Sequence, residues 1–258
     1  MATETVVGAA PRGLEISQDE WELRVQLAAC YRIVDHLGWS ELIFNHISAR
    51  VPGAEEHLLI NPFGLSYREV TASNLIKMDL AGNIVGESPW PVNRAGVIIH
   101  TAIHIARPDV QVAMHTHTTA GCAIAGLDDG LDPNNFYGAQ LWGQIAYHEL
   151  EGITLVPDEQ TRLLSSLGDR WFLMLRNHGL LTCGHSIPSA FFRMWTLQRA
   201  CEIQLATMSA GTPIREISPA ALERSSSEYR SRRQDGLGED AFASLQRKID
   251  EIDPSYRN

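Results

Sequence analysis

Two histidines separated by a single residue could hold a metal ion between them. His115 and His117 lie in V-A-M-H-T-H-T-T-A-G, residues 112–121. Side chains two residues apart point about 200° apart around a helix, but they share one face of a strand. The β-branched Val112 and the short length of the segment favour a strand. The two imidazoles are therefore predicted to share a face, with Met114 on the opposite one.

The third ligand of such an ion would have to come from another strand. His178 follows the apolar run W-F-L-M-L, residues 171–175, which predicts a buried central strand. Gly179 beside it allows close backbone approach or a positive φ. Zinc sits about 2.0–2.1 Å from histidine nitrogens, and catalytic sites keep a position open beside three protein ligands. His178 is thus the candidate third ligand.

Other histidines offer alternatives. His100 and His104 are four residues apart in a predicted helix, so they share a face and could chelate an ion. Their Ile and Ala neighbours suit a buried, hydrogen-bonded role equally well, and spacing alone leaves this pair open. His148, in A-Y-H-E-L, is of the right type for a general acid or base, although a lone strand histidine is more often structural.

Helices and strands alternate along the chain and must position these side chains. Ser17 and Glu20 form an S-x-x-E capping box before a predicted helix over 18–37. Further helices are expected at 95–107, 158–168, 186–210 and 239–252, and strands at 110–117, 143–150 and 171–176. Several connections between strands are too short for helical crossovers, so the sheet should be largely antiparallel.

The division of the chain follows from its composition. Residues 1–14 are small, polar and broken by Pro and Gly, which predicts a flexible tail. Residues 15–212 are expected to form one α/β domain. Residues 213–258 are expected to form a polar segment, loop-like at first and ending in the short helix at 239–252.

The bulk properties exclude some classes of protein. The chain has 258 residues and a formal net charge of −10, so its overall field does not favour nucleic acid. We find no signal peptide and no stretch of 18 apolar residues, and therefore expect no membrane span. The four cysteines form no C-x-x-C pair, which is typical of reduced thiols in the cytoplasm.

Several motifs in a fixed order resemble the class II aldolase/adducin family, and its adducin-like branch most closely. They run from about residue 20 to 210, with one further match near the end of the chain. In chain order they are N-H-I-S-A-R, I-N-P-F-G-L-S-Y-R-E-V-T-A-S-N-L, A-R-P-D-V, M-H-T-H-T-T-A-G, R-N-H-G-L-L-T and I-D-P-S-Y.

The resemblance implies a fold, an assembly and a metal. Members have one three-layer α/β/α domain around a largely antiparallel sheet, usually in rings of four with active sites at subunit interfaces. In the family's enzymes three histidines bind a divalent metal, and their motifs match His115, His117 and His178. By the same resemblance, His100 and His104 are not ligands. Zn²⁺ is the expected ion, with Fe²⁺ or Mn²⁺ as alternatives.

The sequence also departs from the family's sugar-phosphate aldolases. Their catalytic glutamate, about 19 residues before the first metal histidine, corresponds to Gly96 here. Their paired serines before it correspond to Arg94 and Ala95. The remaining substrate-site positions are matched: Asn45 and Ser48 resemble the phosphate loop, and Gly64 the family glycine in P-x-G. A classical sugar-phosphate aldolase is therefore not expected.

The residues that match the family predict a metal-dependent lyase. It would cleave a carbon–carbon bond of a small carbonyl or carboxylate substrate, by retro-aldol reaction or decarboxylation. Arg94 could grip a carboxylate with two hydrogen bonds. His148 and Tyr137 could replace the glutamate in proton transfer. One alternative is a non-haem iron oxygenase that cleaves the side chain of an aromatic α-keto or hydroxy acid. The other is a non-catalytic adducin-like scaffold.

Overall fold

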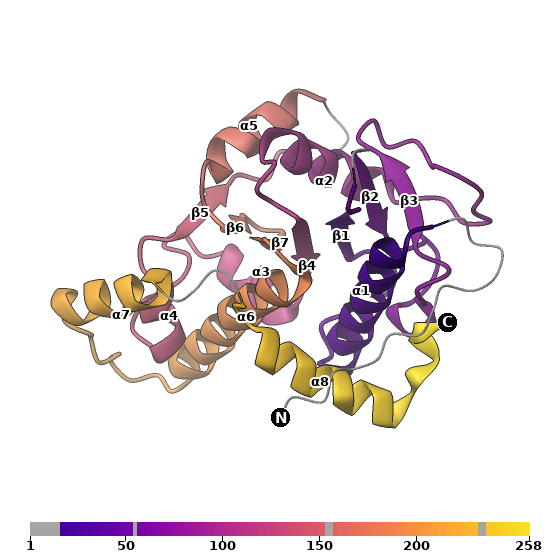
Figure 1. The fold of residues 1–258 in the computed structure, drawn as a ribbon. Helices are drawn as coiled ribbons and strands as arrows, with labels where there is room; N and C mark the ends of the chain where they lie inside the picture. The colour runs from indigo at the N-terminus through magenta and orange to yellow at the C-terminus, as the bar shows by residue number, and fades with distance from the viewer. Residues whose placement is uncertain (1–15, 54–55, 153–156, 232–235) are drawn as a thin grey trace.

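A seven-stranded sheet forms the centre of the molecule (Figure 1). The computed structural model describes residues 16–53, 56–152, 157–231 and 236–258. In spatial order the strands are β3 (Ile76–Asp79), β2 (His57–Ile60), β1 (His46–Arg50), β4 (Val112–Thr116), β7 (Gly179–Gly184), β6 (Phe172–Leu175) and β5 (Ile145–His148). Among the strands of the described residues, only β5 and β6 pair in parallel, so the prediction of a largely antiparallel sheet is confirmed.

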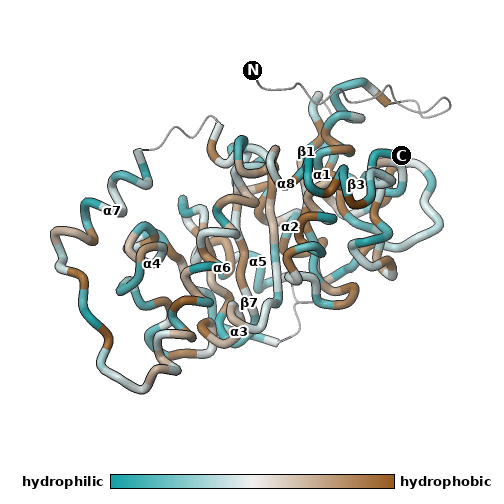
Figure 2. The backbone as a smooth tube through the Cα atoms, turned by 90° about the horizontal axis from the view of Figure 1, so that it is seen from below, coloured by the Kyte–Doolittle hydropathy of each residue, from teal (hydrophilic) through white to brown (hydrophobic). Residues whose placement is uncertain are grey.

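Helices cover both faces of this sheet, which gives the expected three layers. On one face lie α1 (Gln18–His36), α3 (Thr119–Ala125), α6 (Ile187–Ser209) and α8 (Glu239–Ile252); on the other lie α2 (Arg94–Ala106) and α5 (Pro157–Leu167). The helices α4 (Phe136–Leu141) and α7 (Pro219–Ser231) pack on each other at the rim, as Figures 1 and 2 show from two directions. Among the helices of these residues, none has the length and apolar character of a membrane span.

Alternation along β4 assigns its side chains to the two layers. Val112 and Met114 belong to the large core beneath α1 and α6. The opposite face of the sheet carries a smaller core, in which Leu181 and Cys183 of β7 pack with Ile99 of α2. Met114 therefore lies opposite the histidine face, as the period of two predicts.

The first helix begins as predicted, but its acidic residue has another partner. The Ser17 hydroxyl accepts a hydrogen bond from the Glu20 backbone N–H at 3.1 Å. The Glu20 carboxylate is buried and bonds Arg24 at 2.9 Å and Lys77 at 2.8 Å instead of returning to the N-cap. The capping box is thus half formed, and Glu20 ties α1 to β3.

The C-terminal segment differs from the expectation of a polar stretch with one short helix. It contains α7 in addition to α8, followed by the 3₁₀ turn Pro254–Arg257. Tyr256 of this turn is fully buried, and its carbonyl accepts from the Ala72 backbone N–H at 2.8 Å. Arg32 of α1 bonds Asp253 at 2.8 Å. The segment therefore completes the core, because its apolar residues cover α1. The predicted tail at 1–14 lies outside the described residues.

Candidate metal centre

Two neighbouring strands bring three histidines to one end of the sheet. His115 is the second-to-last residue of β4, and His117 follows that strand directly. His178 lies in the tight turn between β6 and β7, and β7 pairs with β4 so that Leu181 faces His115. Gly179 is needed at this crossing, because a Cβ there would lie 2.4 Å from the Thr116 carbonyl oxygen. The turn can therefore approach the end of β4 closely enough for His178 to join the pair.

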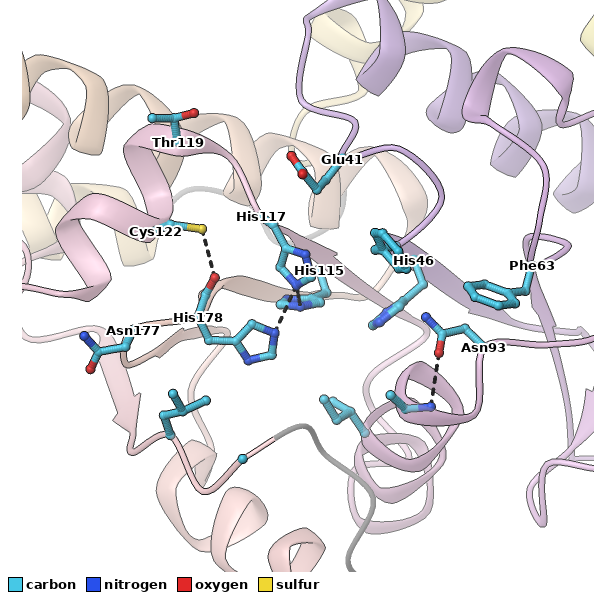
Figure 3. Close-up of a pocket in the computed structure, with 15 residues that line it drawn as sticks. Glu41, His46, Phe63, Asn93, His115, His117, Thr119, Cys122, Asn177 and His178 are labelled. Carbon is cyan, nitrogen blue, oxygen red and sulfur yellow. Dashed lines mark hydrogen bonds between the residues drawn. The ribbon is translucent and has the colours of Figure 1, made fainter.

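The three imidazoles meet through their Nε2 atoms (Figure 3). The distance from His115 Nε2 to His117 Nε2 is 2.7 Å, and that from His117 Nε2 to His178 Nε2 is 3.0 Å. His115 Nδ1 lies 2.9 Å from the Leu180 carbonyl oxygen, which can only accept a hydrogen bond. Neutral His115 therefore carries its proton on Nδ1 and directs the Nε2 lone pair at the other two rings.

This arrangement fits a cation better than it fits hydrogen bonds alone. A proton on His117 Nε2 would have to serve both short contacts, and without it two lone pairs would face each other at 2.7 Å. Zinc bonds histidine nitrogens at 2.0–2.1 Å in tetrahedral geometry, so two nitrogens on one ion lie about 3.3 Å apart. The observed spacings of 2.7 and 3.0 Å are a few tenths of an ångström shorter, a difference that small rotations of the rings would remove. The three residues could therefore hold a divalent ion, with the coordination positions toward the cavity left open.

Burial keeps these imidazoles neutral, which is the form that binds metals. Desolvation, followed by the neighbouring histidines, lowers the pKa of His115 well below its usual value. Desolvation also lowers the pKa of His117, and together with His117 it lowers the pKa of His178 to about 4. All three imidazoles are therefore uncharged at neutral pH, and each has one ring nitrogen with a free lone pair.

Residues behind the histidines fix their backbone. The Asn45 side chain accepts a hydrogen bond from the His117 backbone N–H at 3.2 Å and donates one to the Trp39 carbonyl at 2.7 Å. The Cys122 thiol donates to the His178 carbonyl at 2.9 Å. Such outer partners orient the residues that face a metal.

A cavity of about 880 Å³ opens in front of the three histidines, large enough for a small molecule. Its wall combines apolar and polar side chains. The remaining lining residues are Glu41, Phe44, His46, Phe63, Asn93, Ala95, Ile99, Thr119, Cys122, Leu150, Gly152 and Asn177. Among the residues that the structure describes, Glu41 is the only carboxylate in this wall, and no arginine or lysine lies there.

The sequence profile of the family described as "Class II Aldolase and Adducin N-terminal domain" matches residues 25–205. The protein belongs to the class II aldolase and adducin family. A Pseudomonas aeruginosa protein named "Putative aldolase class 2 protein" is 44% identical, over 98% of this chain and 99% of its own. A Pseudomonas syringae structure titled as an aldolase II superfamily protein superposes with a TM-score of 0.91 at 40% identity, over 95% of this chain and 98% of its own. Alpha-adducin from Rattus norvegicus is 46% identical over 77% of this chain, which spans 28% of that protein.

The structure also locates the other residues that the class II aldolase resemblance singled out. Asn45 and Ser48 are buried behind the wall and do not line the cavity. Gly64 has a φ of +108° and packs against Trp90. Arg94 begins α2 and is exposed, while its neighbours Asn93 and Ala95 line the cavity.

The two candidates for proton transfer lie apart from the histidines. His148 is buried beneath α5, with Nδ1 3.0 Å from the Ser166 hydroxyl and Nε2 3.8 Å from Glu159. Tyr137 packs its ring against Trp195 at the rim. Neither lines the cavity in the described part of the chain, because β5 and α4 carry them away from the β4–β7 end.

His46 also lines the cavity wall, although its spacing from other histidines in the sequence did not identify it. His46 begins β1 and pairs directly with His115 across the strands, with ring centroids 5.0 Å apart. The rival pair His100 and His104 lies behind it, fully buried and hydrogen-bonded to His46 and Ser48. Only the pairing of β1 with β4, which a single sequence does not reveal, brings His46 to the site.

Proposed function

We propose that the protein is a divalent-metal-dependent lyase of the class II aldolase type, with His115, His117 and His178 as the metal ligands. The convergence of the three Nε2 atoms at the floor of the cavity supports this most strongly. Membership of the family supports the class of chemistry. The ligands stand on two paired strands, so the site is held by the sheet itself.

Zn²⁺ is the proposed ion, and the same three nitrogens would also accept Fe²⁺ or Mn²⁺. When bound, the ion supplies Lewis-acid polarisation of a carbonyl and stabilises negative charge that develops beside it. The Leu180 carbonyl accepts a hydrogen bond from His115 Nδ1 and so holds His115 in the tautomer whose Nε2 can bind the ion. Asn45 holds the His117 backbone, and Cys122 that of His178.

The proposed substrate is a small carbonyl or carboxylate compound whose carbon–carbon bond is cleaved. Phe44, Phe63 and Ile99 give the wall an apolar side, and Asn93 and Asn177 offer amides. Because the described wall has no cationic side chain, the metal would supply the charge that holds an anionic group. Arg94 could reach the substrate only by moving from its exposed position.

The cavity also suits a position at a subunit interface. Leu42 and Phe44, on the loop that carries Glu41 to the wall, expose 72% and 45% of their surfaces. Apolar side chains of this size at a cavity mouth are typical of a contact surface. We therefore propose a homotetramer with sites between subunits. The four cysteines are free, which supports a cytoplasmic location.

A second candidate is a non-haem iron oxygenase. The Phe44 and Phe63 rings lie 6.4 Å apart in the cavity wall and could accept an aromatic acid. The family's glutamate, which a retro-aldol reaction would use, is replaced by Gly96. The scaffold alternative is suggested by the similarity to alpha-adducin. Three convergent neutral histidines weigh against it, since a scaffold does not need them.

Metal analysis separates these functions. Protein purified without added metal should contain one equivalent of zinc, and the double variant His115→Ala/His178→Ala should contain none. The matched control is His185→Ala, because His185 is exposed and bonds the Asp109 carbonyl instead. Iron with oxygen uptake on aromatic keto acids would favour the oxygenase. Metal retained by the double variant would overturn the ligand assignment, and wild-type protein that binds no divalent ion would favour the scaffold.

For the lyase, a panel of α-keto and β-hydroxy acids should yield at least one substrate that is cleaved in the presence of zinc. Cleavage should stop on chelation and return when zinc is restored. A zinc-loaded protein that cleaves none of these acids would count against the lyase.

A further inference from the structure

A row of buried polar side chains extends from the cavity into the layer between the sheet and α2. His46 Nδ1 lies 2.7 Å from His100 Nε2, and His100 Nδ1 lies 2.5 Å from the Ser48 hydroxyl. The Ser48 hydroxyl is 2.8 Å from His104 Nε2. The row ends where His104 Nδ1 meets the Val110 carbonyl oxygen at 3.1 Å. All of these side chains are at most 4% exposed.

The final carbonyl sets the direction of every hydrogen bond in the row. A carbonyl oxygen only accepts, so His104 carries its proton on Nδ1 and offers the Nε2 lone pair. The Ser48 hydroxyl donates its one proton to that lone pair and must accept from His100 Nδ1. His100 Nε2 is then a lone pair and accepts from His46 Nδ1. The reverse order would set the His104 Nδ1 lone pair against the Val110 oxygen.

Proton counting leaves His46 as the open end. Each internal contact holds one proton, and an added proton elsewhere in the row would place two in one contact. Burial supports the neutral state, since desolvation lowers the pKa of His104 to about 3 and that of His100 well below its usual value. His46 Nε2 is therefore the one nitrogen of the row without a proton that is not already accepting a hydrogen bond within it.

This open end faces the cavity. His46 lines it, and Figure 3 shows the ring directed into the same space as His115 and His178. The Cδ2–Nε2 edge of His46 packs against the backbone of α2 at Gly96. Because His46 lines the cavity and its Nδ1 is bonded to His100, Nε2 is the ring nitrogen left for a ligand in the cavity.

We propose that the row holds His46 as a fixed hydrogen-bond acceptor for a hydroxyl group of the substrate. A hydroxyl can donate to Nε2, whereas an oxyanion such as a phosphate oxygen would meet a lone pair with no proton between them. Ser48 thus acts as a positioning residue through His100 and does not touch the substrate. The inference rests on the proposed function in taking this cavity as the substrate site. The tautomer itself does not depend on it.

Nitrogen NMR of the imidazoles in metal-free protein tests the tautomer, because a nitrogen with and without a proton resonates in different regions. The His46 signals are assigned by their loss in His46→Asn. We expect Nδ1 of His46 to carry the proton and Nε2 to carry none at pH 7. A proton on Nε2 in the wild-type protein would overturn the proposal.

Ser48→Ala interrupts the row with the loss of one oxygen atom. It should give a mixture of both His46 tautomers, because nothing then orders His100. The matched control is Ser166→Ala, which removes the hydroxyl bonded to His148 outside the cavity and should leave the His46 signals unchanged. A His46 tautomer that is the same in Ser48→Ala as in the wild type would contradict the role of the row.

Binding of glycolate and acetate to the zinc-loaded protein tests the hydroxyl site, since the two differ by one hydroxyl. We expect the preference for glycolate to fall about three- to tenfold in Ser48→Ala, the range of one hydrogen bond, and to persist in Ser166→Ala. An unchanged preference in Ser48→Ala would overturn the hydroxyl site. If the wild-type protein does not bind zinc, the proposed function is overturned instead. The His46 tautomer is measured in metal-free protein, so that result would still hold.

Discussion

The imidazole of His46 occupies the space in front of Gly96. A Cβ at residue 96 would lie 2.5 Å from His46 Cδ2 and 2.8 Å from its Nε2. A glutamate at this helix position, as the resemblance places it in sugar-phosphate aldolases, would therefore collide with His46. The histidine on β1 therefore requires a glycine at this position of α2.

Gly96→Ala should destabilise the protein by about 1–3 kcal/mol, the range for an added methyl group in a packed site. This would outweigh the gain of up to about 1 kcal/mol that alanine brings to a helix. Urea unfolding at pH 7 measures the difference. In a His46→Ala background the same substitution should be neutral or stabilising, because the imidazole is gone. Equal stability of Gly96→Ala and the wild type would show that His46 can move aside.

Asn45 should affect metal binding without touching the metal. Asn45→Ala removes the acceptor of the His117 backbone N–H, and loss of such an outer partner typically costs about 10–100-fold in metal affinity. Competition with a zinc chelator measures this loss. The matched control is Asn74→Ala, since Asn74 also bonds two backbone groups, Thr71 N–H and the Glu69 carbonyl, away from the cavity. Equal zinc affinities of the two variants would refute the link.

Local sequence patterns predicted the elements that carry the site, but not how they meet. The alternation around Val112 placed His115 and Met114 on opposite faces, as observed. The third histidine depends on the pairing of β4 with β7, and its assignment as a ligand stays a prediction. His46 depends on the pairing of β1 with β4 and on His100, 54 residues away in the chain. Such long-range pairings leave no periodicity in a single sequence.

The sequence also failed to predict three helices, two because they are short and one because it is polar. The helices α3 and α4 have 7 and 6 residues, too few for a helical repeat to stand out. α7, P-A-A-L-E-R-S-S-S-E-Y-R-S, buries Leu222, Ser226 and Tyr229 on α4 and neighbouring elements, and is otherwise polar. The contacts of these three residues stabilise the helix, and composition does not reveal them. The polar composition therefore indicated a loop.

Leu42, on the loop that lines the cavity, has a left-handed backbone with a φ of 48°. This conformation costs a non-glycine residue about 1–2 kcal/mol. Leu42→Gly and Leu42→Ala both remove an exposed side chain, but only glycine relieves the backbone. Leu42→Gly should therefore be more stable to urea than Leu42→Ala by up to about 1 kcal/mol. The opposite order would mean that the loop changes its conformation on substitution.

Buried neutral histidines should make the fold sensitive to acid. The pKa of His104 is lowered from 6.5 to about 3 by burial, so between these values the unfolded chain binds a proton that the folded chain does not. Stability is therefore retained above pH 6.5 and lost as the pH falls, by about 1.4 kcal/mol per pH unit for this residue. Urea unfolding between pH 7 and 4.5 should show a slope smaller by this amount in His104→Gln. Ser48→Ala breaks the same row but removes no titrating group, and should keep the wild-type slope. A His104→Gln slope equal to that of the wild type would mean that His104 is already protonated in the folded protein.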